Sequence, residues 1–542
     1  MLNEPSPMKK TVLTLAILLT LAFAVRLVIA FNTYIISSDG PFYLNVAKDF
    51  AAGDYLSALN KQVFHQLYPF LIAAASKFIS NWEWAGMLAS IILSVLAVIP
   101  LYFITKRYFA RPIVIISCLL YCFHPQGAQL SASIFTTGTH ISILLFALWV
   151  TILALETGSH RYFILSGILA FAMYLNRPDG LAFLGITLLG IMFIPAVSWK
   201  SKGIKAICLV IPWALMLIPY LVAVESATGV FGLTGKVSAE AVTDIEVTKS
   251  FGGLYQFVVD FIKGANPILF LLFLVGAISA KPGNSAGPVC GPTGTGRRPL
   301  FVWLVFAGFM VFFTVYAFTH GRMSKRYTVP LFLMMLPWTS AGIYYLGERI
   351  SSRATAKVVS GLVIIILIIL SVFTFKPVGQ DKVIEKTTGQ LLRKYHSARW
   401  WATNQSPVII TTLSRVAYYA NGMSVMPEGW SPLARPHRVP VGLAPRGGKG
   451  GDKDNQKIGD FMQSLKDTVR QRGANYLVLD SRIMRKFPDI ENELAKPFTD
   501  NISVELISRS FGSPTASDND KMADKYYKVY RFIFRAATQE NK

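Results

Sequence analysis

Long apolar runs recur along the first part of the chain, up to about residue 375. They are about 15 to 22 residues long, which is the length a helix needs to cross a hydrocarbon core of about 30 Å. The pattern predicts eleven membrane-spanning helices, at residues 11–31, 84–105, 112–129, 139–155, 162–176, 181–198, 205–224, 265–280, 300–319, 328–347 and 356–375. No small-residue cleavage site follows the first run, so we interpret it as a retained helix rather than a signal peptide.

The segment between the first two runs carries its own helical pattern. Residues 39–52 predict a short amphipathic helix that ends at Gly53, and residues 68–79 predict a second helix. The apolar stripe of the first helix consists of Phe42, Tyr43, Val46, Ala47 and Phe50. Both helices are expected at the membrane surface.

The pattern changes at about residue 376, where short apolar runs alternate with an amphipathic helical segment. This alternation predicts a small soluble α/β domain. The candidate strands are 407–412, 474–480 and 526–534, and the candidate helix is 458–472. Residues 431–457, which are rich in glycine, predict a flexible loop.

We therefore expect a polytopic α-helical membrane protein with a C-terminal soluble α/β domain. The transmembrane domain would span residues 1–375, with an outer loop at 32–83, and the soluble domain would span 376–542. Composition supports the membrane class, because 53% of the residues are hydrophobic and only 15% are charged, whereas soluble domains carry about 25% charged residues. The mean hydropathy is +0.44.

The formal net charge of +23 arises from 53 Lys and Arg against 30 Asp and Glu. The basic residues lie at the ends of the apolar runs, so membrane topology and anionic lipid headgroups explain them and no nucleic-acid partner is predicted. With the N-terminus inside, every inner segment is basic, and the odd number of spans puts the C-terminal domain outside. The inner basic residues are Lys9, Lys10, Lys106, Arg107, Arg111, His160, Arg161, Lys200, Lys202, Lys205, Lys281, Arg297, Arg298, Arg349, Arg353 and Lys357.

One outer segment breaks the charge rule. Residues 320–327 carry Arg322, Lys325 and Arg326 on the side where topology disfavours basic residues. These cations are expected either to dock on lipid headgroups or to bind an anion such as a phosphate near the outer membrane surface.

Two short motifs carry candidate chemistry. Asp39 follows the first run almost directly, where it can cap a helix or act as a general base for an acceptor hydroxyl. Asn176-Arg-Pro-Asp-Gly180 either makes a simple turn or uses Arg177 and Asp179 to orient a polar substrate. Cys118 and Cys122 have no further soft ligands nearby in the sequence, so no metal site is predicted from them.

Together these motifs resemble the GT-C superfamily of membrane glycosyltransferases, in particular the branch that contains the protein O-mannosyltransferases and the aminoarabinose transferase of lipid A. The likeness covers most of the membrane part. The motifs that carry it are Ser38-Asp-Gly-Pro-Phe-Tyr43, Ala52-Gly-Asp-Tyr55, His65-Gln-Leu-Tyr-Pro-Phe70, Asn176-Arg-Pro-Asp-Gly180 and Arg326-Tyr-Thr-Val-Pro330.

The resemblance implies a catalytic base at Asp39 and a donor sugar carried on a polyprenyl or dolichyl phosphate. Gly40 stands where many members have a second acid, so a metal-binding carboxylate pair is not implied, although a divalent metal stays open as a cofactor. The outer cations Arg322, Lys325 and Arg326 would hold the phosphate, with Arg177 as a helper. The other implied substrate-binding residues are Tyr43, Asp54, His65, Tyr68, Asp179, His320 and Tyr327.

The expected function is that of an inverting hexosyl- or pentosyltransferase, with mannose as one candidate sugar. It would act on a protein, lipid or glycan acceptor at the outer face of a membrane, and the compact loops favour the bacterial plasma membrane. Two alternatives stay open. One is a transporter or a flippase for lipid-linked sugars, and the other is a non-catalytic assembly or sensor protein whose soluble domain binds a partner.

Overall fold

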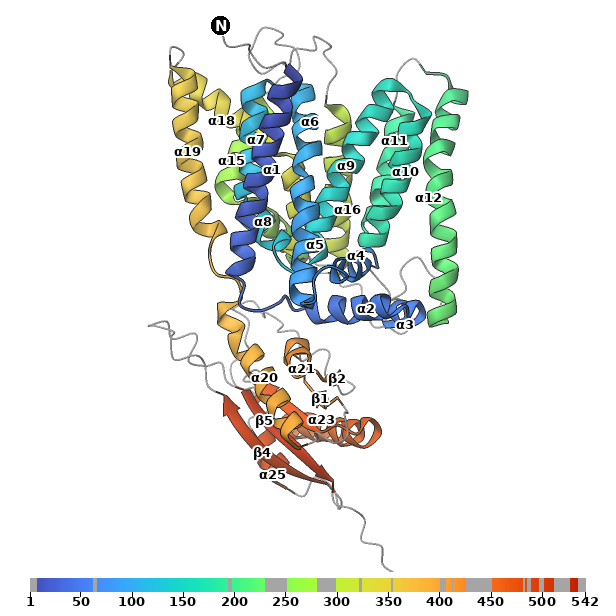
Figure 1. Cartoon of the computed structure of the whole chain (residues 1–542), viewed down its shortest axis with the longest axis vertical. Coiled ribbons are helices and arrows are strands. Elements are labelled where there is room, and N and C mark those ends of the chain that lie inside the picture. The colour runs from blue at the N-terminus through green and yellow to red at the C-terminus, as the bar shows by residue number, and fades with distance from the viewer. Residues whose placement is uncertain are drawn as a thin grey trace, which may run out of the picture. The chain divides into compact units, whose positions relative to one another are not determined.

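The computed structural model in Figure 1 contains two compact units. The helical unit comprises Met1–Thr33 and Phe42–Val378, and the C-terminal unit comprises Tyr34–Pro41 and Gly379–Lys542. Residues 34–41 therefore group with the C-terminal unit, although they follow the first helix in the sequence. The structure describes residues 7–61, 66–193, 197–229, 251–279, 299–320, 324–351, 354–399, 406–411, 413–425, 451–480, 483–484, 489–496, 502–510 and 527–534.

The helical unit consists of long helices with shorter ones at one end, where α2, α3 and α4 lie across the ends of the long helices (Figure 1). Its elements are α1 (Pro7–Phe31), α2 (Gly40–Ala52), α3 (Tyr55–Lys61), α4 (Leu67–Ser76), α5 (Trp82–Leu96), α6 (Val98–Tyr108), α7 (Arg111–Phe123), α8 (Pro125–Ser131), α9 (Thr136–Thr157), α10 (His160–Asn176), α11 (Gly180–Met192), α12 (Trp199–Thr228), α14 (Phe251–Ala265), α15 (Pro267–Ser279), α16 (Leu300–His320), η1 (Lys325–Tyr327), α17 (Val329–Met334), α18 (Leu336–Ile350) and α19 (Thr355–Thr374).

Each of the eleven predicted apolar runs overlaps a helix or a pair of consecutive helices. Within the described residues, six helices are long and apolar enough to cross a membrane, or eight if each of two bent pairs forms one span. The class of multi-pass membrane protein is confirmed, whereas the number eleven stays a prediction. The bends lie between α7 and α8, at 58°, and between α14 and α15, at 93°. Both second helices begin at a proline, Pro125 and Pro267, which cannot continue the preceding turn.

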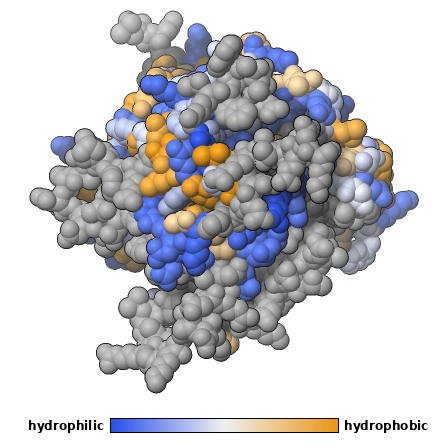
Figure 2. Space-filling view, turned by 90° about the horizontal axis from the view of Figure 1, so that it is seen from below, coloured by the Kyte–Doolittle hydropathy of each residue, from blue (hydrophilic) through white to orange (hydrophobic). Residues whose placement is uncertain are grey.

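Apolar side chains also point outward along the membrane helices. The exposed large hydrophobic residues of α12 and α19 include Ile207, Ile211, Leu215, Ile218, Val222, Ile364, Ile365, Ile368 and Val372, as expected of helices that face lipid. Figure 2, the view from below, shows hydrophobic and hydrophilic residues next to one another.

Two glycines bring α15 and α18 into backbone contact. A side chain at Gly276 would overlap the carbonyl oxygen of Trp338, and one at Gly342 would overlap that of Leu272. Small residues at such crossings let membrane helices approach closely, since packing rather than the hydrophobic effect holds them together.

We expect Gly276→Ala to lower the stability of the helical unit by about 1–3 kcal/mol, because the added methyl group meets backbone that no rotamer change can move away. Thermal unfolding in detergent would measure the loss. Gly361→Ala in α19 is the matched control, because no atom lies within 4 Å of a Cβ built there. Equal unfolding temperatures for the two variants would contradict the close crossing.

The predicted outer helices are present with small shifts in their ends. The helix predicted at 39–52 is α2, and it ends just before Gly53. Gly53 has a φ of 81°, a backbone conformation that glycine adopts without strain. The helix predicted at 68–79 is α4, Leu67–Ser76, while α3 was not predicted.

The C-terminal unit is an α/β domain, as predicted. Its sheet has five strands in the order β2-β1-β3-β5-β4, with β1 parallel to β2 and β3, and β5 antiparallel to β3 and β4. Its elements are η2 (Gln380–Lys382), α20 (Val383–Arg399), β1 (Val408–Ile410), α21 (Ser414–Tyr419), β2 (Met423–Val425), α23 (Gly451–Arg472), β3 (Tyr476–Asp480), α25 (Ile490–Ala495), β4 (Ile502–Ser510) and β5 (Tyr527–Phe534).

The three predicted strands coincide with β1, β3 and β5, but β2 and β4 were missed. The flexible loop predicted at 431–457 is wrong over its last part, because α23 begins at Gly451. Residues 431–450 of that prediction lie outside the described residues.

Helices cover both faces of the sheet. On one face Leu477 and Leu479 pack with Leu465 of α23 and Leu494 of α25. On the other face Tyr476 and Val478 pack with Leu392 of α20 and Val416 of α21. The side chains of β3 alternate between the two cores, as the two-residue repeat of a strand requires.

Candidate functional site

Arg177 and Asp179 form a buried ion pair in the turn between α10 and α11. The Arg177 Nε donates to Asp179 Oδ1 at 3.0 Å and Nη2 donates to Oδ2 at 2.6 Å. Their side chains are 2% and 7% exposed. Two parallel hydrogen bonds fix the orientation of a guanidinium group as well as its position.

The sequence of the turn explains this geometry. Arg177 ends α10 in an extended conformation, with φ −156° and ψ 138°, which a following proline favours, here Pro178. Gly180 packs against the backbone of Met173, where a side chain would overlap. The extended Arg177 and the tight turn together bring the guanidinium and carboxylate groups face to face.

Residues of η1 complete the cluster. The Arg177 guanidinium lies over the ring of Tyr327 at 4.3 Å, and Arg326 lies 5.4 Å from the same ring. Both contacts are in the range of cation–π interactions. We call Arg177, Asp179, Arg326 and Tyr327 the arginine cluster. The cluster contains two guanidinium groups and one carboxylate, so it carries excess positive charge.

Two further residues contact this cluster and were not predicted from the sequence. His140 in α9 places Nε2 4.0 Å from Asp179 Oδ2, and Phe135, just before α9, lies under Arg326 at 5.5 Å. His140 is buried, and an ionisable residue within an apolar run is a signal that could have identified it. The N-terminal part of α9 therefore belongs to the site.

Tyr43 and Tyr68, both predicted to bind substrate, are buried packing residues. Tyr68 donates to the Gly86 carbonyl at 2.9 Å and accepts from Ser90 Oγ at 2.9 Å, and its ring packs edge-on against Tyr43 at 5.3 Å. Burial raises the pKa of the Tyr68 hydroxyl above its usual value, so it remains a hydrogen-bond donor. Contact of these residues with substrate stays a prediction.

The other predicted site residues are placed less directly. Asp54 is exposed, and its carboxylate accepts from the backbone N–H of Ser57 at 3.0 Å, so it caps α3. His65 and Arg322 lie outside the described residues, and for His320 and Lys325 the structure describes the backbone at the end of α16 and the start of η1. Of the three outer cations predicted to bind the phosphate, Arg326 is therefore the one whose side chain the structure describes.

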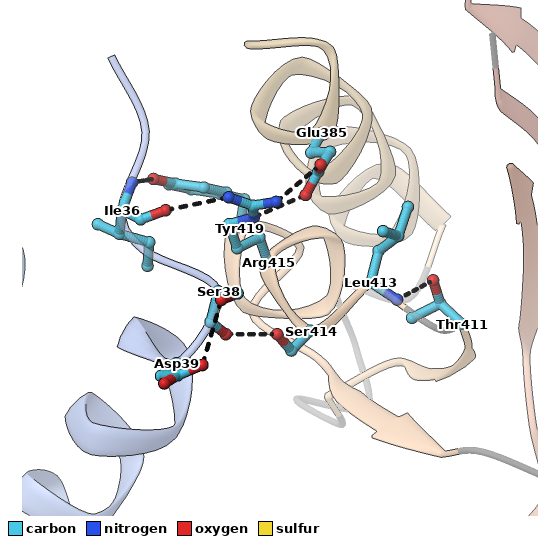
Figure 3. Close-up of polar contacts among 9 residues, drawn as sticks. All are labelled: Ile36, Ser38, Asp39, Glu385, Thr411, Leu413, Ser414, Arg415 and Tyr419. Atoms are coloured by element: carbon cyan, nitrogen blue, oxygen red, sulfur yellow. Dashed lines mark hydrogen bonds and ion pairs between the residues drawn. The ribbon is translucent and has the colours of Figure 1, made fainter. Parts of the chain in front are cut away.

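Asp39 belongs to the C-terminal unit by its contacts, and it directly precedes α2. Its side chain is half-buried, and Oδ1 accepts from Ser38 Oγ at 3.1 Å. Figure 3 shows its carboxylate beside the short segment that leads into α2. Within the described ranges, no group of three or more His, Cys, Asp and Glu residues could hold a metal ion.

Comparisons with known proteins agree with this architecture. Residues 66–222 match the family model described as Dolichyl-phosphate-mannose-protein mannosyltransferase, a range that includes Arg177 and Asp179. No curated protein matches the sequence. The single-particle structure of the arabinofuranosyltransferase AftD from Mycobacteria is a more distant likeness, with a TM-score of 0.48 at 12% identity, over 96% of this chain and 40% of AftD.

Two crystal structures of ArnT from Cupriavidus metallidurans are similar over nearly the whole chain. The structure bound to undecaprenyl phosphate has a TM-score of 0.61 at 11% identity and covers 97% of this chain and 98% of ArnT. The apo structure has a TM-score of 0.59 at 11% identity, over 96% and 98%. The chain therefore has the fold of ArnT, and the expected resemblance is confirmed at the level of the fold.

Proposed function

We propose that this protein transfers a sugar from a polyprenyl-phosphate donor to an acceptor hydroxyl, with inversion at the anomeric carbon. The observation that carries the proposal is the arginine cluster, in which buried Arg177 and neighbouring Arg326 gather around Tyr327. Fixed cations are the groups needed to hold a phosphate ester and to stabilise its charge as it leaves.

The chemistry follows from these assignments. The acceptor oxygen attacks the anomeric carbon on the face opposite the phosphate, and Asp39 takes the proton from the acceptor hydroxyl. The bond between the anomeric carbon and the phosphate oxygen breaks, and both of its electrons remain on the phosphate. The products are the glycosylated acceptor and a free polyprenyl phosphate, whose new negative charge the arginine cluster stabilises.

The similar proteins support the class of donor. ArnT is similar to this chain in fold, and one of its structures holds undecaprenyl phosphate. The match to a dolichyl-phosphate-mannose-protein mannosyltransferase model makes mannose the first sugar to test. We place the reaction at the outer face of a bacterial plasma membrane, with the C-terminal unit outside, because the basic residues mark the opposite loops as inner.

The direct test is a transfer assay with the full chain in nanodiscs and a panel of polyprenyl-phosphate sugars. We expect free polyprenyl phosphate to appear with one donor, and only when an acceptor is supplied as membrane extract. The same preparation without extract is the control for simple hydrolysis. Absence of release with every donor would refute the proposal.

A transporter or flippase for lipid-linked sugars is the second candidate, and Arg26 favours it. This arginine is fully buried in α1, and its Nη1 donates to the Ala22 carbonyl at 3.2 Å. Its guanidinium lies 4.8 Å from the ring of Tyr121, and Nε and Nη2 have no hydrogen-bond partner among the described residues. Buried charges in membrane helices often mark a path for polar cargo.

A further inference from the structure

The segment that carries Asp39 is held by side chains from a distant part of the sequence. Residues Tyr34–Pro41 belong to the same compact unit as Gly379–Lys542, and the side chains of Ile35 and Ile36 are buried. No helix or strand runs through residues 34–39. The conformation of this segment therefore depends on the side chains that contact it.

Arg415 is the central contact. Its Nε and Nη2 bind the Glu385 carboxylate at 2.6 and 2.8 Å, while Nη1 donates to the Ile36 carbonyl at 3.4 Å. The side chains of Arg415 and Glu385 are 10% and 5% exposed. Figure 3 shows the guanidinium between the carboxylate of α20 and the Ile36 backbone. Glu385 thus orients Arg415, and Arg415 binds the segment.

Two neighbours of Arg415 on α21 add to this contact. Ser414 Oγ donates to the Ser38 carbonyl at 3.0 Å, and the Ile36 N–H donates to the Tyr419 hydroxyl at 3.4 Å (Figure 3). Arg415 and Tyr419 are four residues apart, so they share one face of the helix. All three side chains bind backbone atoms one to three residues before Asp39.

Residues at the start of the C-terminal region also contact the segment 34–41. Gly379 has a φ of 74°, which favours glycine, and a side chain there would overlap Ile35. Lys386 Nζ donates to the Tyr34 carbonyl at 3.5 Å. These contacts fix the segment from its first residue to the one before Asp39.

A buried ion pair is a poor source of stability, because apolar residues of similar volume would serve as well or better. It does fix geometry, since the five N–H groups of the planar guanidinium point in fixed directions. A general base needs such geometry, because its oxygen must lie within hydrogen-bond distance of the proton it removes.

We propose that Arg415 is a positioning residue, which acts with Ser414 and Tyr419 to hold the backbone before Asp39 and so to orient the Asp39 carboxylate for proton removal. The C-terminal unit is then part of the catalytic apparatus. This inference rests on the proposed function, in which Asp39 is the base.

Two measurements on the full chain test the inference. In Arg415→Lys the charge is kept, but one ammonium group cannot replace three directed donors. We expect faster hydrogen–deuterium exchange in the peptide that covers residues 34–41. We also expect kcat to fall by about 10- to 100-fold, since small misplacements of a catalytic group have effects of this size, while the donor KM stays unchanged.

Two other variants complete the design. Ser414→Ala removes one exposed contact with little risk to folding. It is expected to speed the exchange at residues 34–41 and to lower kcat, both by less than Arg415→Lys does. Glu491→Gln is the matched control, because Glu491 pairs with Lys528 and accepts from the Tyr530 hydroxyl at 3.1 Å in the same unit. It is expected to leave both the exchange at 34–41 and kcat unchanged.

Normal exchange at residues 34–41 in both Arg415→Lys and Ser414→Ala would overturn the proposed anchoring. Faster exchange with a normal kcat, or with a raised donor KM alone, would overturn the positioning role. Absence of transfer by the unmodified protein would instead refute the proposed function, and the exchange measurement would still decide whether the C-terminal unit holds the segment.

Discussion

Asp39→Asn is expected to lower kcat for sugar transfer by about 10²- to 10⁴-fold, the usual contribution of a positioned general base. An amide cannot accept the proton from the acceptor hydroxyl, whereas its oxygen still accepts the hydrogen bond that Ser38 Oγ donates to Asp39. Release of free polyprenyl phosphate from the preferred donor would measure the loss.

This substitution also separates the two roles predicted for Asp39. Asparagine caps helices about as well as aspartate, so a residue that only capped α2 would tolerate the change with full activity. Full activity in Asp39→Asn would thus exclude the catalytic role. Asp467→Asn, at a carboxylate in α23 that accepts from Gln463 at 3.1 Å, is the control for loss of an acidic side chain.

Arg177→Met is expected to cost about 3–5 kcal/mol of stability, because it leaves the carboxylate of Asp179 buried without its ion-pair partner. It should also lower kcat/KM by at least about 100-fold, as expected for loss of a cation that stabilises a leaving phosphate. Thermal unfolding in detergent and the donor assay would measure the two effects.

The double variant Arg177→Met, Asp179→Leu distinguishes a structural role of this pair from a catalytic one. Replacing both charges with apolar groups should restore most of the stability, since no buried charge is left without its partner. Transfer should nevertheless stay as low as in the single variant. A stable double variant with normal transfer would show that the Arg177–Asp179 pair only holds the turn together.

The membrane helices could be predicted because apolar runs of sufficient length carry their own signal. The number of spans could not, because composition does not show where a helix bends. Asn266, between α14 and α15, adopts a φ of 71°, and the 93° bend there lies at the start of the apolar run predicted at 265–280.

The candidate site could likewise be predicted only in part from the sequence. The turn at residues 176–180 and the cations of 320–327 could be recognised as chemistry at one end of the helices. The stacking of Arg177 on Tyr327 joins residues 150 positions apart, and no local pattern encodes such a contact. The tie between Arg415 and Ile36 spans 379 positions and was missed for the same reason.

The division of the chain into units has a consequence for protein engineering. Because residues 34–41 group with residues 379–542, the chain passes between the two units at three points, after Thr33, after Pro41 and after Val378. A chimera that exchanges only the C-terminal region with a homologue would leave Ile35 and Ile36 facing a foreign surface. The transferable module is discontinuous, and a graft should carry the octapeptide 34–41 together with the region that begins at Gly379.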